Sequence, residues 1–261
     1  CYEDQSIGKM IEAGNFEKKD ALSYGEKVFD YMEKNWFNDE AYLKYEGRPV
    51  VYTFGPQFFF NKEQWDTLFS HCSNRPYLIT LEGHSENFAD GSYNWFNMDG
   101  KKTIPQVVKQ LNNFYQRQND KPFLTATVYS GFHDIYAEAG GKSYGYLNCY
   151  EGRTFNLTLD AALKAFPDVI QVATWNDYGE GTIIEPTVQN GYRELEVLLQ
   201  LQKKYNPDFP YSELDLRAPL ALYKLITAEE NKVTESKRNA AQSAMNAILS
   251  GDAEQYRSII S

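Results

Sequence analysis

The chain has 261 residues, enough for one large domain or two small ones, and its 42% hydrophobic content supports a packed core rather than disorder. Its formal net charge of −10 argues against nucleic acid or an anionic membrane as a partner, because both need a basic surface. No stretch approaches about 18 consecutive apolar residues, so the sequence predicts no membrane-spanning helix.

Strand-like and helix-like segments alternate along the first two thirds of the chain. Short apolar runs rich in β-branched residues predict complete strands at residues 48–54, 75–82, 121–129 and 168–175. Apolar residues at helical spacing predict helices at residues 20–36, 62–70, 103–115, 159–166 and 192–204. Strands that alternate with helices predict a parallel sheet with βαβ crossovers.

Two carboxylates follow the last predicted strand and form the strongest functional signal. Asp177 and Glu180 lie three positions apart, among Trp175, Asn176 and Tyr178. A glycine on each side of Glu180 allows backbone angles that would aim both acids the same way. We expect both to face one cleft, because side chains at the carboxyl ends of barrel strands line the mouth. The alternative is a capped turn whose acids are solvated.

Polar side chains also follow two earlier strands. Glu82 and His84 come after the strand at residues 75–82, and Tyr129, His133 and Asp134 come after the strand at residues 121–129. On a barrel, all five would line the same mouth and contact substrate. For the two histidines a structural, hydrogen-bonded role is an equal alternative.

Beyond a Pro-containing breaker at residues 206–210 the pattern changes to helices. Residues from 219 onward predict two or three of them, with Ala241, Ala244, Met245 and Ile248 sharing one face. We therefore divide the chain into an α/β unit at residues 1–205 and a helical tail at residues 206–261 that packs on it. A separate partner-binding module is the alternative.

The composition favours a carbohydrate ligand and offers no metal site. Aromatic residues make up 15% of the chain, and rings with polar rims match the apolar faces and hydroxyls of sugars, although tyrosines are also common in cores. Cys1, Cys72 and Cys149 form neither a metal-spaced cluster nor an even disulfide framework. We expect no metal and no cofactor.

The motifs resemble glycoside hydrolase families 71 and 99, and especially the bacterial proteins intermediate between them. The likeness is clearest at residues 125–187. WNDYGE at residues 175–180 resembles family 71, whereas GTIIEP at residues 181–186, which includes Glu185, and GFHD at residues 131–134 resemble family 99. These families are (β/α)8 TIM barrels that hydrolyse α-linked glycans: α-1,3-glucan in family 71 and internal α-mannosides in family 99.

The resemblance implies roles for the acid pair. Glu180 stands where family 99 keeps its general acid/base, which protonates the departing glycosidic oxygen. Asp177 stands where family 99 has a glutamate that acts on the sugar 2-hydroxyl, while family 71 has aspartate there and inverts. Gly179 replaces a family 99 histidine, a departure from the mannosidase pattern. Trp175, Asn176, Tyr178 and Glu185 are the implied substrate contacts.

The strand count and the resemblance together predict part of a barrel. Four complete strands, with residues 1–4 as the end of a fifth, fall short of eight, so we expect about five βα units, an open parallel sheet and roughly three absent upstream units. A lipoprotein cysteine at Cys1 is the alternative.

We expect a metal-independent bacterial glycosidase that is periplasmic, on the cell surface or secreted, and an inactive, poorly soluble isolated chain. A non-catalytic carbohydrate-binding relative and a protein-interaction scaffold are the alternative functions.

Overall fold

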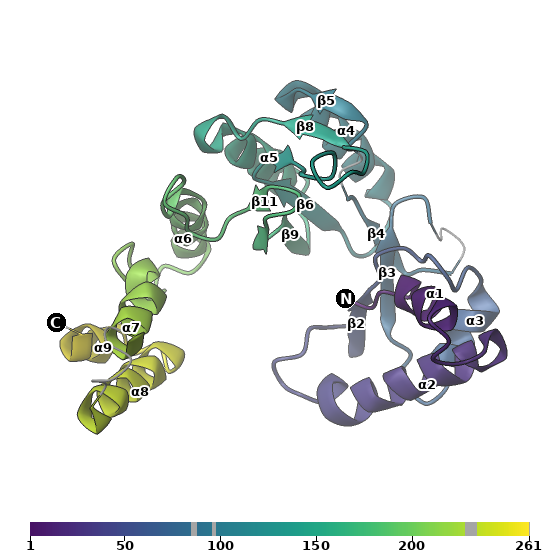
Figure 1. The fold of residues 1–261 in the computed structure, drawn as a ribbon, viewed down its shortest axis with the longest axis horizontal. Coiled ribbons are helices and arrows are strands. Elements are labelled where there is room, and N and C mark those ends of the chain that lie inside the picture. Colours follow the sequence, from purple (N-terminus) through teal and green to yellow (C-terminus); the bar gives the residue numbers. More distant parts are fainter. Residues whose placement is uncertain (85–87, 96–97, 228–233, 261) are drawn as a thin grey trace.

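The computed structural model describes residues 1–84, 88–95, 98–227 and 234–260. Figure 1 shows the chain passing from an N-terminal α/β part, in purple and blue, through a second α/β part in teal to a group of C-terminal helices in green and yellow. In the described part of the chain, no helix is both long enough and apolar enough to cross a membrane.

The N-terminal part is built on one mixed sheet with strand order β1-β2-β3-β4. Strands β2 (Arg48–Tyr52), β3 (Tyr77–Leu81) and β4 (Gly91–Tyr93) are parallel, and β1 (Lys44–Tyr45) is antiparallel to β2. Tyr2 forms an isolated parallel bridge with Thr53, at the place where the sequence predicts the end of a strand. The three residues of β4 escape sequence analysis because so short a segment carries no periodicity.

The helices of this part pack on the sheet around buried aromatic residues. They are α1 (Gln5–Glu12), η1 (Lys18–Asp20), α2 (Ala21–Met32), the π-helical turn η2 (Glu33–Phe37) and α3 (Lys62–Leu68). Phe29, Trp65 and Leu68 are fully buried between them. Asp4 is also buried, and it accepts hydrogen bonds from the backbone N–H groups of residues 57–59 at 2.7–3.0 Å. Asp4 therefore holds the loop that follows β2.

The second part pairs β6 (Thr125–Tyr129) with β9 (Val169–Ala173) in parallel, from Thr125 opposite Val169 to Tyr129 opposite Ala173. Helices α4 (Ile104–Gln118) and α5 (Arg153–Lys164) pack together, and α5 packs on β6. The predicted start of α4 is confirmed: Thr103 is its N-cap, with Gln106 completing a capping box. Phe166 was expected on α5, but the helix ends before it and the ring is 90% exposed.

Short strands form the loops at the carboxyl ends of β6 and β9. After β6, the strands β7 (Phe132–His133) and β8 (Gly145–Leu147) pair antiparallel, and β8 also pairs with β5 (Gly100–Lys102). A 3-10 turn, η3 (Tyr150–Gly152), leads into α5. After β9, the chain makes a hairpin of β10 (Asn176–Asp177) and β11 (Thr182–Ile183).

The α/β class is confirmed, but the described sheets do not close into a barrel. The four strands that the sequence predicts belong to two sheets, β2 and β3 to one and β6 and β9 to the other, rather than to one continuous open sheet. Strand β6 packs beside β4, and side-chain hydroxyls of β6 bond to Tyr52 of β2 and to Asn94, which follows β4. The Tyr52 and Thr125 hydroxyls lie 2.7 Å apart, and the Thr127 hydroxyl donates to the Asn94 carbonyl oxygen at 2.6 Å.

The C-terminal region is helical, as predicted. It comprises α6 (Arg193–Tyr205), η4 (Asp215–Arg217), α7 (Ala218–Thr227), α8 (Glu235–Leu249) and α9 (Ala253–Ile260). Ala218, Ala244, Ala247 and Tyr256 form a small core of their own. Met245 was expected on the buried face with Ala244, but it is 43% exposed.

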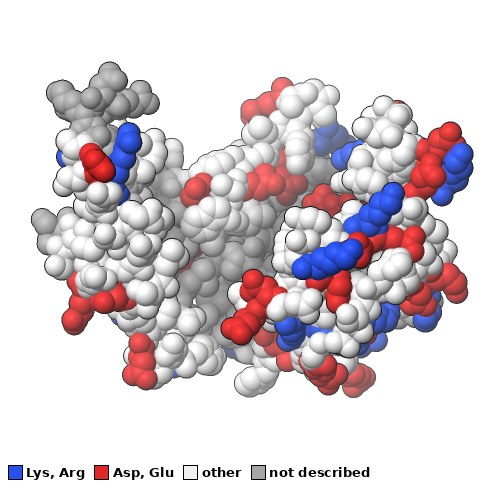
Figure 2. All heavy atoms as spheres, turned by 90° about the horizontal axis from the view of Figure 1, so that it is seen from below, with Lys and Arg blue, Asp and Glu red and all other residues white. Residues whose placement is uncertain are grey.

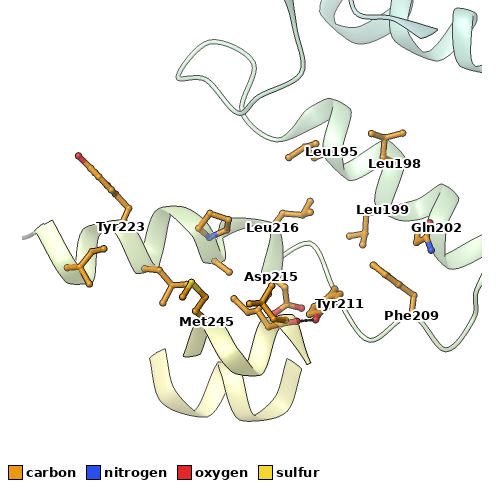
Figure 3. A pocket seen from close by; sticks show the side chains of 16 residues that line it. Leu195, Leu198, Leu199, Gln202, Phe209, Tyr211, Asp215, Leu216, Tyr223 and Met245 are labelled. Carbon is orange, nitrogen blue, oxygen red and sulfur yellow. Dashed lines mark hydrogen bonds between the residues drawn. The ribbon is translucent and has the colours of Figure 1, made fainter. Parts of the chain in front are cut away.

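Helix α6 faces the tail across an apolar groove of about 890 Å³, which Figure 3 shows from close by. Leu198 and Leu199 line it from α6, Leu216 from η4, and Met245 from α8. Leu195 and Leu198 are only half-buried on this face. Two polar contacts also join α6 to the tail: Arg217 to Glu196 at 3.3 Å and Gln200 to Glu213 at 3.0 Å.

Candidate active site

The acid pair lies in the β10–β11 hairpin, immediately beyond the carboxyl end of β9. Asp177 pairs with Thr182, and its backbone N–H donates to the Thr174 hydroxyl at 3.0 Å. The Asp177 carboxylate in turn accepts the backbone N–H of Glu180 at 2.9 Å. The predicted turn thus forms, and one oxygen of Asp177 closes it. The side chain of Asp177 is exposed, whereas Glu180 is half-buried.

The loop that follows β6 docks on this hairpin through its backbone. The His133 N–H donates to the Glu180 carbonyl oxygen at 2.8 Å, and the Ile135 N–H donates to the Gly179 carbonyl oxygen at 3.0 Å. Gly181 makes this approach possible: its φ is +64°, and a Cβ there would lie 2.9 Å from the His133 carbonyl oxygen. The sequence placed His133 and Glu180 at one barrel mouth, and the structure brings them into direct backbone contact.

Tyr136 contacts the Glu180 side chain, although sequence analysis did not single it out. Its hydroxyl donates to the Glu180 carboxylate at 3.0 Å. Burial raises the pKa of Glu180 above its usual value; the hydrogen bond from Tyr136 opposes this rise, and the charges of Asp177 and Asp134 add to it. Burial and the same bond raise the pKa of Tyr136 to about 12, so the phenol stays protonated as a donor.

Asp134 lies beneath this loop and is only 6% exposed. Its carboxylate accepts the Tyr144 backbone N–H at 2.6 Å. Burial alone would raise the pKa of Asp134, but hydrogen bonds from the Tyr144 N–H, the Ser143 hydroxyl and the N–H groups of Tyr136 and Gly145 lower it. The carboxylate therefore satisfies backbone donors inside the loop, a use that strand-end position alone does not indicate.

The aromatic residues of the hairpin are open to solvent. Trp175 is 49% exposed and Tyr178 is 55% exposed. The Tyr178 hydroxyl donates to the Glu185 carboxylate at 2.9 Å, which ties Glu185 to the acid pair's own turn. Asn176 is exposed as well, and pairs with Ile183 in the hairpin. These four predicted contacts thus belong to one surface around Asp177.

The other predicted residues form a second polar group. Asn94 donates to the Glu82 carboxylate at 2.8 Å, and Arg117 forms an ion pair with the same carboxylate. The Tyr129 hydroxyl lies 3.3 Å from both the side-chain and the backbone oxygen of Asn94, and the His84 ring lies 3.2 Å from the Glu82 carbonyl oxygen. Glu82 and Tyr129 therefore meet at Asn94, and His84 contacts the Glu82 backbone, in a group separate from the contacts of Glu180.

Seen from below, the molecule is hollowed between the C-terminal helices and the α/β parts, and acidic side chains lie along the hollow (Figure 2). This distribution agrees with the net charge of −10, which disfavours anionic ligands. Among the described residues, no three His, Cys, Asp or Glu side chains are grouped as metal ligands.

The fold is similar to solved glycoside hydrolase structures. Two structures of the GH99 endo-α-mannosidase from Bacteroides thetaiotaomicron superpose with a TM-score of 0.50 at 18% identity; each match covers 64% of this chain, and 56% or 53% of the mannosidase. A glycoside hydrolase-like protein superposes with a TM-score of 0.54 at 14% identity, covering 72% of this chain and 63% of that one. No protein-family model and no curated protein matches the sequence.

The chain shares part of a glycoside hydrolase fold. The resemblance to family 99 that the motifs predict is thus confirmed at the level of fold, over 53–63% of the length of those structures. At these identities the likeness concerns the path of the backbone and not the chemistry of the site.

Proposed function

We propose that this chain carries the catalytic carboxylates of a glycoside hydrolase that cleaves α-linked glycans of the α-mannan or α-1,3-glucan type. Its α/β parts would be the βα units of a (β/α)8 TIM barrel, with β2, β3, β6 and β9 as barrel strands. The partner would be an oligosaccharide or polysaccharide. The observation that carries the proposal is the environment of Glu180: a half-buried carboxyl with a raised pKa beside a second carboxylate.

This environment suits the general acid of glycoside cleavage. The reaction needs one carboxyl that keeps its proton near neutral pH and a second that is ionised, about 5–10 Å apart depending on mechanism. Burial favours the protonated form of Glu180, so it would donate a proton to the departing oxygen. Asp177 is exposed and would act on water or on the sugar, in a metal-independent reaction. Trp175, Tyr178 and Glu185 would contact the sugar.

The second candidate is a carbohydrate-binding relative without turnover. One observation favours it: an oxygen of Asp177 accepts the Glu180 N–H and so already closes the turn. In this reading the Asp177 carboxylate is a structural acceptor of the turn. The exposed rings of Trp175 and Tyr178 would still bind sugar.

The deciding test is hydrolysis of α-1,3-glucan and α-mannan oligosaccharides by the full-length protein, with sugar binding measured in parallel by calorimetry. Cleavage that E180Q abolishes while binding persists supports the glycosidase. Binding without cleavage in the unmutated protein supports the non-catalytic relative, and absence of both refutes the two candidates together. For a substrate of this kind, we propose a periplasmic, cell-surface or secreted location in a bacterium.

A further inference from the structure

The loop between β7 and β8 reaches the acid pair through one hydroxyl. Phe132 pairs with Leu147 and His133 pairs with Tyr146, so residues 134–144 form the loop between the two strands. Tyr136 projects from that loop to the Glu180 carboxylate, 3.0 Å away. The ring of Tyr144, near the other end of the loop, packs edge-on against Tyr136 at 5.5 Å.

Asp134 ties the two ends of this loop together. It is buried, and it accepts the Tyr144 N–H at 2.6 Å, ten residues along the chain. Inside the loop, the Gly141 N–H donates to the Tyr136 carbonyl oxygen at 2.7 Å. The backbone of Tyr136 and the far end of the loop at Tyr144 are thus each held by a hydrogen bond. A buried carboxylate is costly when an oxygen lacks a partner, and Asp134 Oδ1 is buried with no hydrogen-bond partner among the described residues. Its presence here therefore needs a reason beyond stability.

We propose that Asp134 is a positioning residue, whose hydrogen bonds to the loop backbone hold the Tyr136 hydroxyl against the Glu180 carboxyl. Its importance for catalysis rests on the proposed function, in which Glu180 is the acid. Tyr136 contacts Glu180 directly, whereas Asp134 acts on it through the loop and through its own negative charge.

The titratable groups that act on Glu180 are Tyr136, Asp177 and Asp134. The two aspartates favour the protonated carboxyl, since like charges repel, and the Tyr136 hydroxyl favours the ionised one, since it donates to it. The hydroxyl therefore limits how far Glu180 is driven toward the protonated form. Loss of the Tyr136 hydroxyl must shift Glu180 titration to higher pH.

The test measures the titration of Glu180 in the ligand-free protein, by carbon NMR of labelled glutamate side chains. Y136F keeps the ring and removes the donor, so we expect a rise of roughly 0.5–1 pH unit. Y146F removes a hydroxyl from the adjacent strand β8, where the ring packs on His133, and should leave the titration unchanged. An unchanged titration in Y136F would overturn the proposal.

Asp134 is tested in two backgrounds. D134N removes a negative charge, which lowers the pH at which Glu180 titrates. It also releases Tyr136, which raises that pH. The net fall should therefore be smaller in the native background than in Y136F, where there is no hydroxyl to release. Equal falls would show that Asp134 acts by charge alone. If D134N does not fold, D134E replaces it. This variant keeps the charge but disturbs the loop contact, so the pH at which Glu180 titrates should rise in the native background only. An equal rise, or none, in both backgrounds would contradict positioning.

These titrations need no turnover, so they remain informative if the protein cleaves no glycan. Absence of cleavage would refute the proposed function and leave the positioning of Tyr136 by Asp134 to be judged by NMR. In an active enzyme, the alkaline limb of kcat/KM against pH should move upward in Y136F and stay in place in Y146F, because the limb reports the acid of the free enzyme.

Discussion

Two glutamates follow strands of this protein and have opposite surroundings. Glu82, after β3, bonds to the Asn94 amide and forms an ion pair with Arg117. Glu180, after β9, is half-buried beside a neutral phenol and two aspartates. An ion pair uses a carboxylate as a fixed charge, whereas burial among acids suits a carboxyl that carries a proton. Position after a strand is thus shared, and the neighbours decide the chemistry.

The largest expected effect separates the two glutamates by turnover. E180Q keeps the shape and removes the transferable proton, so the hydrolysis rate should fall by about 10²–10⁴-fold with sugar binding largely retained. E82Q, the matched control, should change kcat much less, because its carboxylate is a partner for Arg117. Similar losses of kcat in the two variants would break the comparison, and activity of E180Q within a few-fold of the unmutated protein would remove Glu180 from the role.

Alanine substitutions at two glycines beside these glutamates distinguish the cost of backbone strain from the contribution of loop docking. Gly181 and Gly83 both have positive φ, +64° and +79°. Alanine at Gly83 should cost about 1–2 kcal/mol of strain, since its Cβ meets nothing within 4 Å in the described part of the chain. Alanine at Gly181 should cost ~1–3 kcal/mol more, because its Cβ meets the His133 backbone. Denaturant unfolding measures both, and equal losses would mean that the loops do not dock.

The smallest expected effect is on stability as a function of pH. The folded-state pKa of Glu180 lies above its ordinary value of 4.5, so its contribution to stability is full below that value and is lost as pH rises through the folded pKa. E180Q should therefore raise the melting temperature relative to the unmutated protein at pH 7, and hardly change it at pH 4. E82Q should instead lower the melting temperature at pH 7. It loses a partly exposed ion pair with Arg117, which contributes at most about 1 kcal/mol to stability. Thermal scans at the two pH values check both signs.

Much of the local structure could be predicted from sequence patterns. The strand before the acid pair and helix α4 with its cap at Thr103 formed as expected. Local signals suffice for them: a run of β-branched residues, and an N-cap before residues at helical spacing. The turn that holds Asp177 and Glu180 also follows from its glycines and acids, and one hydrogen bond closes it.

Only the tertiary structure decided the contacts of Tyr136 and Asp134, because these contacts depend on pairing between distant segments. Tyr136 reaches Glu180 because the His133 and Ile135 N–H groups bond to the hairpin backbone, and no local pattern encodes backbone bonds across more than forty residues. The same holds for Asp134, whose place after β6 indicated the mouth but which is buried, with one oxygen bonded to the loop backbone at Tyr144. Sequence by itself indicated the candidate acid pair and the turn that carries it. Packing determined that Tyr136 meets Glu180, because contact between loops depends on how the sheets beneath them are placed.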